Sequence, residues 1–177
     1  LSVNAVSGQK MMEAGIDKIE DLHAYVPNFT MSETGIGTNI YIRGIGSGIN
    51  QGFEQSVGMY VDGVYYGRAQ LARAPFLDLE RVEVLRGPQS ILFGKNSIAG
   101  ALNITTAKPT QEFEGMVSAT YEPDHNEQVY DAMVSGGLTD TLAGRLAYRN
   151  RSMDGYVDNL TNNNDEPNRD EETIRGS

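Results

Sequence analysis

One stretch of the sequence decides the fold, and it reads Asp78-Leu79-Glu80-Arg81-Val82-Glu83-Val84-Leu85-Arg86-Gly87-Pro88-Gln89-Ser90. Charged and aliphatic residues alternate in its middle, and this period of two predicts a strand over residues 81–86 with Val82 and Val84 on one face. Gly87 and Pro88 then turn the chain, and Pro88 is well placed as the first residue of a short helix through residues 89–93. The stretch therefore predicts a strand, a turn and a helix in quick succession.

Two helices are expected before this stretch. Ser7 is a good N-cap for a helix over residues 8–14, and Gly15 is placed as its C-terminal stop. Asp17 is expected to cap a second helix, in which apolar residues recur at helical spacing until Pro27 ends the pattern.

Short strands are expected on both sides of the stretch. They cover residues 1–6, 39–43, 57–61, 64–66 and 102–106. Asp62-Gly63 is a two-residue hairpin signal that joins the third of these strands to the fourth. Short strands mixed with short helices over this length predict a small α+β domain.

Glycines crowd residues 34–52, where Gly44-Ile45-Gly46-Ser47-Gly48 has the look of a phosphate-binding turn. Such a turn has to open directly into a helix. Here polar loop residues and Phe53 follow instead, so these glycines are expected to serve loops whose backbone visits positive φ.

Charge divides the chain into two parts. Its 177 residues carry 24 acidic and 14 basic groups, for a formal net charge of −10. Residues 1–110 hold 9 basic and 10 acidic groups, whereas residues 111–177 hold 5 basic and 14 acidic groups. The acidic balance argues against a nucleic-acid-binding module, which needs a basic patch. The break near Pro109 predicts one domain over residues 1–110 and a differently built part over residues 111–177.

Several kinds of site and segment are not expected in this sequence. It has no Cys, which excludes a disulfide framework, a thiolate zinc site and a cysteine nucleophile. No run of 18 apolar residues occurs, so no transmembrane helix is expected. A charged and then apolar leader is not found after Leu1, so any targeting segment is expected to be missing. His23 and His125 are isolated, and the acidic run over residues 158–172 lacks the spacing of a calcium loop, so no catalytic or metal site is expected.

Three segments of the second part alternate with period two, over residues 113–121, 129–138 and 142–149. The expected apolar faces carry Phe113, Gly115, Val117, Ala119 and Tyr121 in the first segment, Tyr130, Ala132, Val134, Gly136 and Leu138 in the second, and Leu142, Gly144, Leu146 and Tyr148 in the third. Their lengths suit strands that cross a bilayer, and tyrosines at their ends suit its interfaces. A soluble antiparallel sandwich alternates in the same way, so the pattern alone leaves both architectures open.

The connections between these segments differ in length. A short polar loop is expected over residues 122–127, a tight turn at Thr139-Asp140, and a long acidic loop over residues 154–172. Short turns at one end and longer loops at the other are typical of an outer-membrane barrel.

The opening stretch, together with four further motifs, resembles the plug domain of TonB-dependent outer-membrane receptors. These motifs are Ile42-Arg43-Gly44, Val57-Gly58-Met59-Tyr60-Val61-Asp62-Gly63, Leu92-Phe93-Gly94 and Ala99-Gly100-Ala101-Leu102-Asn103-Ile104. The resemblance implies an α+β plug domain, a small mixed sheet with short helices, over residues 1–110. Residues 111–177 would then be the first antiparallel strands of a truncated transmembrane β-barrel, which favours the barrel over the sandwich.

The resemblance also implies roles for particular residues. Arg43 and Arg86 would lock the plug to glutamates of the barrel wall, since a guanidinium fork binds carboxylates bidentately. Ordinary ion pairs of these arginines with Glu80 or Glu83 inside the domain remain the alternative. The motif turns would be built by Gly44, Asp62, Gly63, Gly87, Pro88, Gly94 and Gly100.

Ligand-facing loops are implied at Ser32, Glu33, Gly48, Ile49, Asn50, Tyr65, Tyr66 and Arg68. The aromatic residues among them would stack on a ligand such as a catecholate chelate. Simple packing of these rings against the barrel wall is the alternative.

The function implied is active uptake of a scarce, bulky ligand across the outer membrane of a Gram-negative bacterium. A ferric siderophore leads, and cobalamin or a glycan are alternatives within the same class. The implied partners are TonB with its inner-membrane energising complex, outer-membrane lipid and the small-molecule ligand. No enzyme activity, cofactor or nucleic-acid partner is implied, and the box that TonB grips would precede residue 1. Outside this class, a soluble β-rich binding module and a hydrolase with paired carboxylates remain rival hypotheses.

Overall fold

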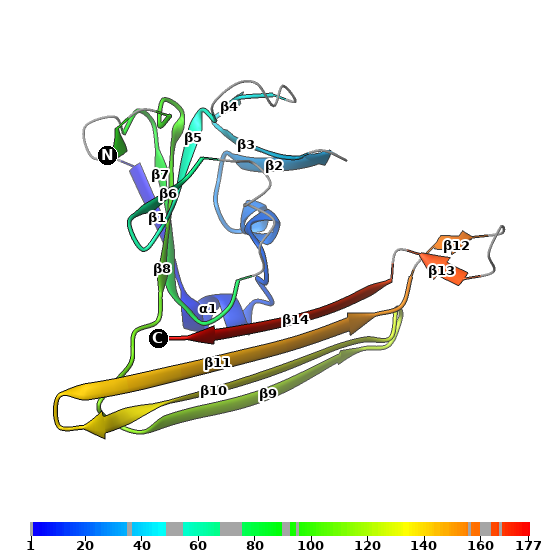
Figure 1. The fold of residues 1–177 in the computed structure, drawn as a ribbon. Helices are drawn as coiled ribbons and strands as arrows, with labels where there is room; N and C mark the ends of the chain where they lie inside the picture. The colour runs from blue at the N-terminus through cyan, green and yellow to red at the C-terminus, as the bar shows by residue number, and fades with distance from the viewer. Residues whose placement is uncertain are drawn as a thin grey trace. The chain divides into compact units, whose positions relative to one another are not determined.

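The chain divides into two compact units, Leu1–Ala107 and Lys108–Ser177, called here the first and the second unit. The computed structural model describes residues 2–34, 37–48, 55–67, 76–89, 93–94, 96–155, 157–159, 164–166 and 168–177. Each unit is built around its own sheets (Figure 1).

A five-stranded mixed sheet organises the first unit. Its strands lie in the order β1 (Ser2–Ser7), β7 (Leu79–Arg86), β8 (Gly100–Thr106), β5 (Val57–Val61) and β6 (Val64–Tyr66). Only the β5–β8 pair within this sheet is parallel. Strands far apart in the sequence thus become neighbours, as the expected α+β class allows.

A second layer covers one face of this sheet. It contains the helix α1 (Gly8–Glu13), the 3-10 helix η1 (Ile19–Ala24) and a small sheet of β2 (Phe29–Thr34), β3 (Gly37–Ile42) and β4 (Ile45–Gly46). Val82 and Val84 are fully buried between the layers, which confirms that they share the core face of their strand. The core between the layers further includes Ile19, Leu22, Phe29, Ile42, Met59 and Leu102.

The first helix begins where the sequence predicts it. The Ser7 hydroxyl accepts a hydrogen bond from the Lys10 amide at 3.2 Å, and Gly15 follows the helix with a φ of +64°. The second expected helix is a 3-10 helix with Lys18 at its N-cap, so the prediction of Asp17 as the cap was wrong. The reason is that Asp21 reaches back, and its carboxylate accepts the amides of Asp17 and Lys18 at 3.0 and 3.1 Å.

The prediction of a strand through Arg43 also needs correction. β3 ends at Ile42, and Arg43 lies in the following turn with a φ of +53°. Its amide donates to the Asn28 carbonyl at 2.8 Å instead of continuing the strand. A residue in the left-handed region bends the backbone away from the ladder, so the strand stops there.

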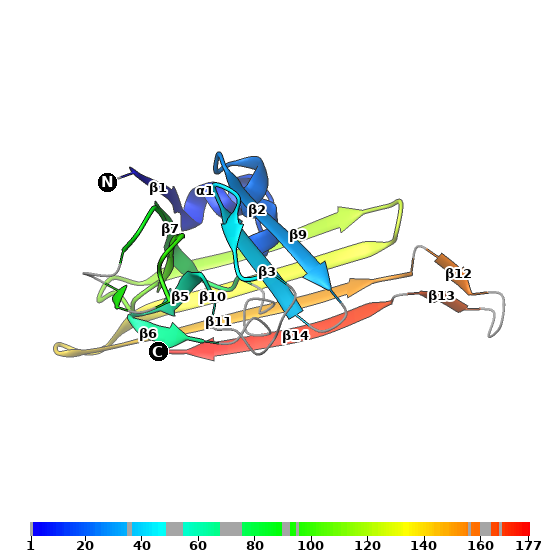
Figure 2. The same cartoon turned by 90° about the horizontal axis from the view of Figure 1, so that it is seen from above.

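The second unit is an antiparallel sheet in the order β14 (Arg169–Gly176), β11 (Leu142–Met153), β10 (Glu127–Thr139) and β9 (Glu114–Glu122). Seen from above, these strands run side by side (Figure 2). A separate hairpin of β12 (Val157–Asn159) and β13 (Asn164–Glu166) follows β11.

The expected acidic loop over residues 154–172 is therefore interrupted by strands. β14 begins at Arg169 and pairs with β11 from Met153↔Arg169 to Leu146↔Gly176. The high charge of this segment hides its alternation, because both faces of β14 carry charged residues at their start. None of the described helices has the length and apolar character needed to cross a membrane.

Candidate functional site

The turn at Pro27-Asn28 brings the two motif arginines to the same place. Arg86 at the end of β7 donates from Nη1 to the Pro27 carbonyl at 3.3 Å. Arg43 donates its amide to the next carbonyl, that of Asn28, at 2.8 Å. Asn28 has a φ of +61°, so this turn is itself in the left-handed region. Two arginines that are 43 positions apart in the sequence are thus anchored to adjacent residues.

The carboxylates beside Arg86 in the sequence pair with a different arginine. Arg81 contacts Glu83 at 3.3 Å and also contacts Glu80. Glu83 accepts a further hydrogen bond from Asn103 at 2.6 Å. The hydrogen bond that Glu83 accepts from Arg81, and then the negative charge of Glu83, raise the pKa of the Arg81 guanidinium above its ordinary value. The Glu80 and Glu83 carboxylates are therefore used by Arg81.

Alternation along β7 explains this choice of partner. Arg81 and Glu83 point to one face of the sheet, whereas Arg86 shares the opposite, core face with Val82 and Val84. Counting parity along the strand would have predicted the Arg81–Glu83 pair. Among the described residues, no carboxylate pairs with Arg43 or Arg86.

The Asp62-Gly63 turn does more than reverse the chain. Both residues have positive φ, +50° and +80°, which confirms the expected hairpin between β5 and β6. The Asp62 carboxylate also accepts the amide and the hydroxyl of Thr106 at 2.9 and 2.7 Å. This contact ties the hairpin to the end of β8. Sequence reasoning missed it because the two residues are 44 positions apart.

Gly44, Gly87 and Gly94 lie in connections between elements of the first unit, each with a positive φ. Gly100 is instead the first residue of β8, so its prediction as a turn residue was wrong, although its φ of +153° is also positive. At Gly100 a side chain is sterically excluded as well, because a Cβ would overlap the Leu85 carbonyl and come within 2.8 Å of Ile42 Cδ1. Pro88 is exposed, and the Phe93 amide donates to the Gln89 carbonyl at 2.9 Å, as in one helical turn. The residues between Gln89 and Phe93 lie outside the described part of the chain.

An aromatic cluster lies on the face of the five-stranded sheet opposite the main core. The Tyr60 ring is 4.7 Å from that of Phe93 and 5.4 Å from that of Tyr65, centroid to centroid. The Tyr60 hydroxyl donates to the Phe93 carbonyl, and Asn96 donates to the Tyr65 hydroxyl at 2.8 Å. Burial raises the pKa of Tyr60, and the neighbouring Tyr65 adds to this effect. Tyr60 was not predicted as a site residue, although it lies in a quoted motif.

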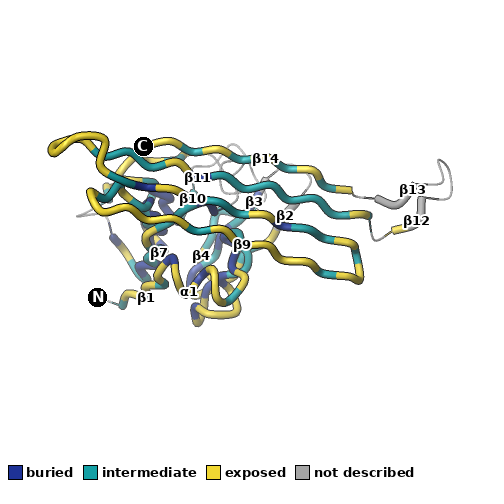
Figure 3. Tube along the Cα trace, turned by 90° about the horizontal axis from the view of Figure 1, so that it is seen from below, coloured by how far each residue is buried: buried dark blue, intermediate teal, exposed yellow. Residues whose placement is uncertain are grey.

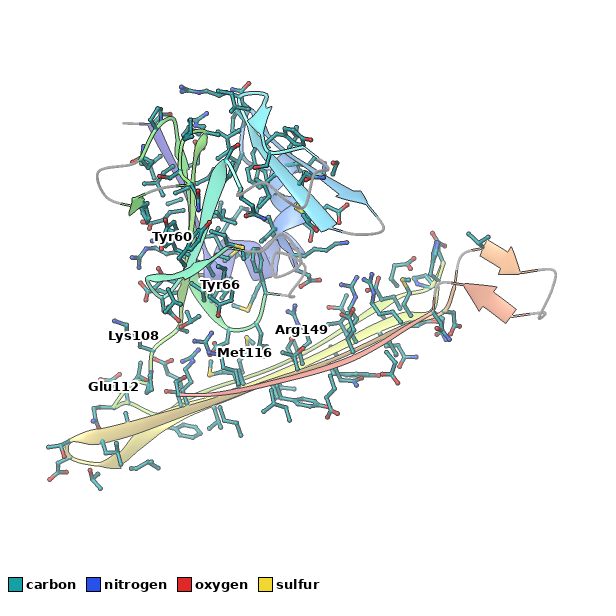
Figure 4. All side chains as sticks on the ribbon, turned by 45° about the horizontal axis from the view of Figure 1, so that its top comes forward. Tyr60, Tyr66, Lys108, Glu112, Met116 and Arg149 are labelled. Carbon is teal, nitrogen blue, oxygen red and sulfur yellow. The ribbon has the colours of Figure 1, made fainter. Side chains whose placement is uncertain are left out.

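The residues expected in ligand-facing loops are distributed over several elements. Tyr65 belongs to the aromatic cluster, whereas Tyr66 packs against the main core. Tyr66 and Tyr60 are labelled in Figure 4. Ser32 is exposed on β2, where Ser32 and Glu33 pair with Asn39 and Thr38 of β3. Gly48 follows β4 with a φ of +68°. The remaining three, Ile49, Asn50 and Arg68, lie outside the described residues.

One face of the second unit is apolar and exposed. The register places Tyr130, Ala132 and Val134 of β10 beside Ala119, Val117 and Gly115 of β9, as the alternation predicts. Exposed fractions reach 85% for Val117 and 71% for Leu138. Most described residues of these strands are exposed or half-buried, and few are buried (Figure 3). This apolar face ends at three tyrosines, Tyr121, Tyr130 and Tyr148. The residues beyond or beside them are polar or acidic, namely Gln128, Asn150, Ser152, Asp170 and Glu172.

The opposite face of the same sheet carries paired charges. Arg149 binds Asp131 on the neighbouring strand at 2.6 Å, and Arg145 binds Glu114 at 3.3 Å. Arg151 pairs with Glu127 in the same way. Met116 lies on this face too (Figure 4). A sheet with one apolar and one ion-paired face suits a boundary between lipid and a polar interior.

The described part of the chain lacks the arrangement that a metal centre needs. No group of three or more His, Asp or Glu residues gathers there in a way that could hold a metal ion. The Nδ1 atom of His23 lies 2.6 Å from the Glu20 carbonyl, and that of His125 lies 3.8 Å from the Glu122 carboxylate.

Comparison with known proteins gives one family match and many relatives. The family model described as "TonB-dependent Receptor Plug Domain" matches residues 1–101. The iron-regulated outer membrane virulence protein of Vibrio cholerae serotype O1 is 31% identical over 163 residues, which is 80% of this chain and 23% of that protein. The vitamin B12 transporter of Photobacterium profundum is 27% identical over 161 residues, which is 87% of this chain and 25% of that protein.

A solved structure has a similar fold over nearly all of the chain. The ferric yersiniabactin uptake receptor of Yersinia pestis is 27% identical, with a TM-score of 0.83. The match covers 98% of this chain and 27% of that receptor. The chain therefore spans about a quarter of the length of the relatives that it matches.

Proposed function

Because the chain belongs to the TonB-dependent receptor family through its plug domain, we propose that it is part of an outer-membrane receptor for active uptake of a bulky ligand. The ligand class that we propose is a ferric siderophore. The function is transport, and no chemistry on the ligand is involved.

The observation that carries this proposal is the two-faced sheet that directly follows the plug fold. Its apolar face ends at tyrosines, and its other face is lined by cross-strand ion pairs. Strands of transmembrane barrels alternate lipid-facing apolar residues with polar residues that face the lumen. Residues 1–110 are therefore assigned to the plug and residues 111–177 to the first barrel strands, which need the rest of the barrel for closure.

Arg43 and Arg86 are assigned to locking the plug inside the barrel. Neither guanidinium has a carboxylate partner among the described residues, whereas the neighbouring Arg81 has two. Both residues meet the Pro27-Asn28 turn, Arg86 through its side chain and Arg43 through its backbone amide. Arginine suits this role since its planar fork binds carboxylates bidentately.

The ligand class rests on what similar proteins are named for. The Vibrio relative is named as iron-regulated, and the Yersinia structure is that of a ferric yersiniabactin receptor. The Photobacterium relative is named for vitamin B12, so cobalamin is the first alternative and a glycan the second. The ligand-facing residues that we propose are Ser32, Glu33, Gly48, Ile49, Asn50, Tyr65, Tyr66 and Arg68. TonB, with its inner-membrane energising complex, would supply the work that opens the plug.

Uptake by whole cells tests this proposal. The full-length gene is expressed in a Gram-negative host that lacks its own siderophore receptors, with and without a functional TonB. Iron-55 uptake is measured with a panel of ferric siderophores, and labelled cobalamin uptake serves as the comparison. We expect TonB-dependent accumulation of at least one iron chelate. If the cells accumulate cobalamin alone, the proposed ferric siderophore is wrong and cobalamin takes its place. Equal accumulation with and without functional TonB would contradict the proposed mechanism.

A further inference from the structure

Asn4 and Arg86 lie on the same face of two neighbouring strands. In the β1–β7 register, Asn4 is opposite Val84 and Ser2 is opposite Arg86, so Asn4 and Arg86 are diagonal neighbours. Val84 is fully buried on this face, which places Asn4 and Arg86 at the margin of the main core. Diagonal neighbours in an antiparallel pair are within reach of long side chains. The other strand beside Arg86 offers only Gly100, which has no side chain there.

Each of these two side chains has a buried polar atom with unused hydrogen-bonding capacity. Asn4 Oδ1 and Arg86 Nε are both buried, and neither has a hydrogen-bond partner among the described residues. Oδ1 is an acceptor and the Nε–H group is a donor, so the two are chemically complementary. Buried polar groups in proteins are nearly always satisfied, directly or through an ordered water.

We infer that Asn4 is the positioning residue of Arg86: its amide oxygen accepts a hydrogen bond from one buried water, and this water accepts the Arg86 Nε–H hydrogen bond. The Pro27 carbonyl holds Nη1 at 3.3 Å, so the guanidinium is fixed at two points. The other N–H groups of its fork are then presented in one orientation to a carboxylate outside the described chain. This inference rests on the proposed locking role of Arg86.

The test is nuclear magnetic resonance of the full-length receptor in detergent, with nitrogen-15 in its arginines. The Arg86 Nε–H signal is assigned by its loss in Arg86→Lys. Its proton exchange with water is expected to be about fivefold to tenfold slower than that of an exposed arginine, the factor that one hydrogen bond gives. An Arg86 Nε–H group that exchanges as fast as an exposed one would overturn the inference before any Asn4 variant is made.

Variants then assign the bond to Asn4. Asn4→Leu removes the acceptor at similar size and is expected to abolish the slow exchange, whereas Asn4→Asp keeps an acceptor and retains it. Ser2→Ala, on the same strand face and opposite Arg86, is the matched control and leaves it unchanged. Slow exchange that persists in Asn4→Leu contradicts the assignment. The same variants are assayed for ligand uptake. If slow exchange depends on Asn4 but uptake is normal in Asn4→Leu and in Arg86→Lys, the Asn4 contact stands. The locking role of Arg86 is then overturned.

Discussion

Three arginines of the first unit have quite different surroundings, and their roles follow from these. Arg81 is half-buried beside two carboxylates, so its charge is neutralised within its own strand. Arg86, on the opposite face, meets a backbone carbonyl instead. Arg43 lies beyond its strand in a left-handed turn. Residue type alone does not distinguish the three arginines. The face of β7 separates Arg81 from Arg86, and the turn after β3 sets Arg43 apart from both.

Replacing Arg86 by Gln should weaken retention of the plug in the full-length receptor. The substitution removes the charge that a wall carboxylate would pair with, and a broken buried pair is costly. We expect cells to become sensitive to a large antibiotic, such as vancomycin, that the closed receptor excludes. Arg81→Gln is the control, because pairs as exposed as those of Arg81 contribute at most about 1 kcal/mol. Equal sensitivity in the two variants would contradict the locking role.

Replacing Tyr60 by Phe should lower the free energy of unfolding of residues 1–110 by about 1 kcal/mol, the usual net contribution of a hydrogen bond. The ring stays in place, but the Phe93 carbonyl loses its donor. Tyr25→Phe is the control, since the Tyr25 hydroxyl is 3.5 Å from the Ala14 carbonyl in an exposed position. Urea unfolding of the three proteins measures the difference, and equal losses in both variants would contradict the assignment.

Tyr60 should also make stability depend on alkaline pH. Burial, and then Tyr65, raise its pKa above the ordinary 10.0 of a tyrosine. Above pH 10 the unfolded chain releases this proton while the folded unit still holds it, so the free energy of unfolding falls as the pH rises. Tyr60→Phe should remove this part of the decline. An identical pH profile in the variant would show that Tyr60 does not cause it.

At the scale of elements, local patterns predicted more than distant pairings. The Asp62-Gly63 hairpin, the Ser7 cap and the alternating faces of β9 to β11 were all predictable, because each depends on residues a few positions apart. The parallel β5–β8 pair was not, since its strands are separated by about 40 residues. The 3-10 form of η1 depends on a back-reaching carboxylate that helical spacing does not reveal.

The same limit applies to the candidate site. The motifs named Arg43 and Arg86, but their common anchor at Pro27-Asn28 comes from the fold. Asp62 was expected only as a turn residue, and its contact with Thr106 depends on where β8 ends. β14 was hidden by its acidic composition, which resembles that of a loop.

The two faces of β9 should respond differently to the same charge. Val117→Arg puts a cation on the apolar face, at a position 85% exposed, which costs about 2–4 kcal/mol at the bilayer midplane. Met116→Arg, the adjacent residue on the opposite face, is the matched control. The folded fraction of the full-length receptor is read from its altered gel mobility before heating. We expect a loss only in Val117→Arg, and equal loss in both would contradict the assignment of the faces.

At the scale of the whole molecule, the two units differ in what stabilises them. The first unit has a core buried between two layers, including fully buried Leu22, Val82 and Leu102. The second has exposed apolar side chains on one face and two open sheet edges, β9 and β14. Open edges and exposed apolar faces favour aggregation in water. Residues 1–110 should therefore fold alone, whereas residues 111–177 should not.

Hydrogen exchange of the 177-residue chain in buffer without detergent tests this account most directly. It reports the protection of each strand's amides within one sample. We predict slow exchange in β5, β7 and β8 of the first unit and fast exchange in β9, β10, β11 and β14 of the second. Equal protection in both units would contradict the assignment of a self-sufficient plug joined to strands that need the rest of a barrel.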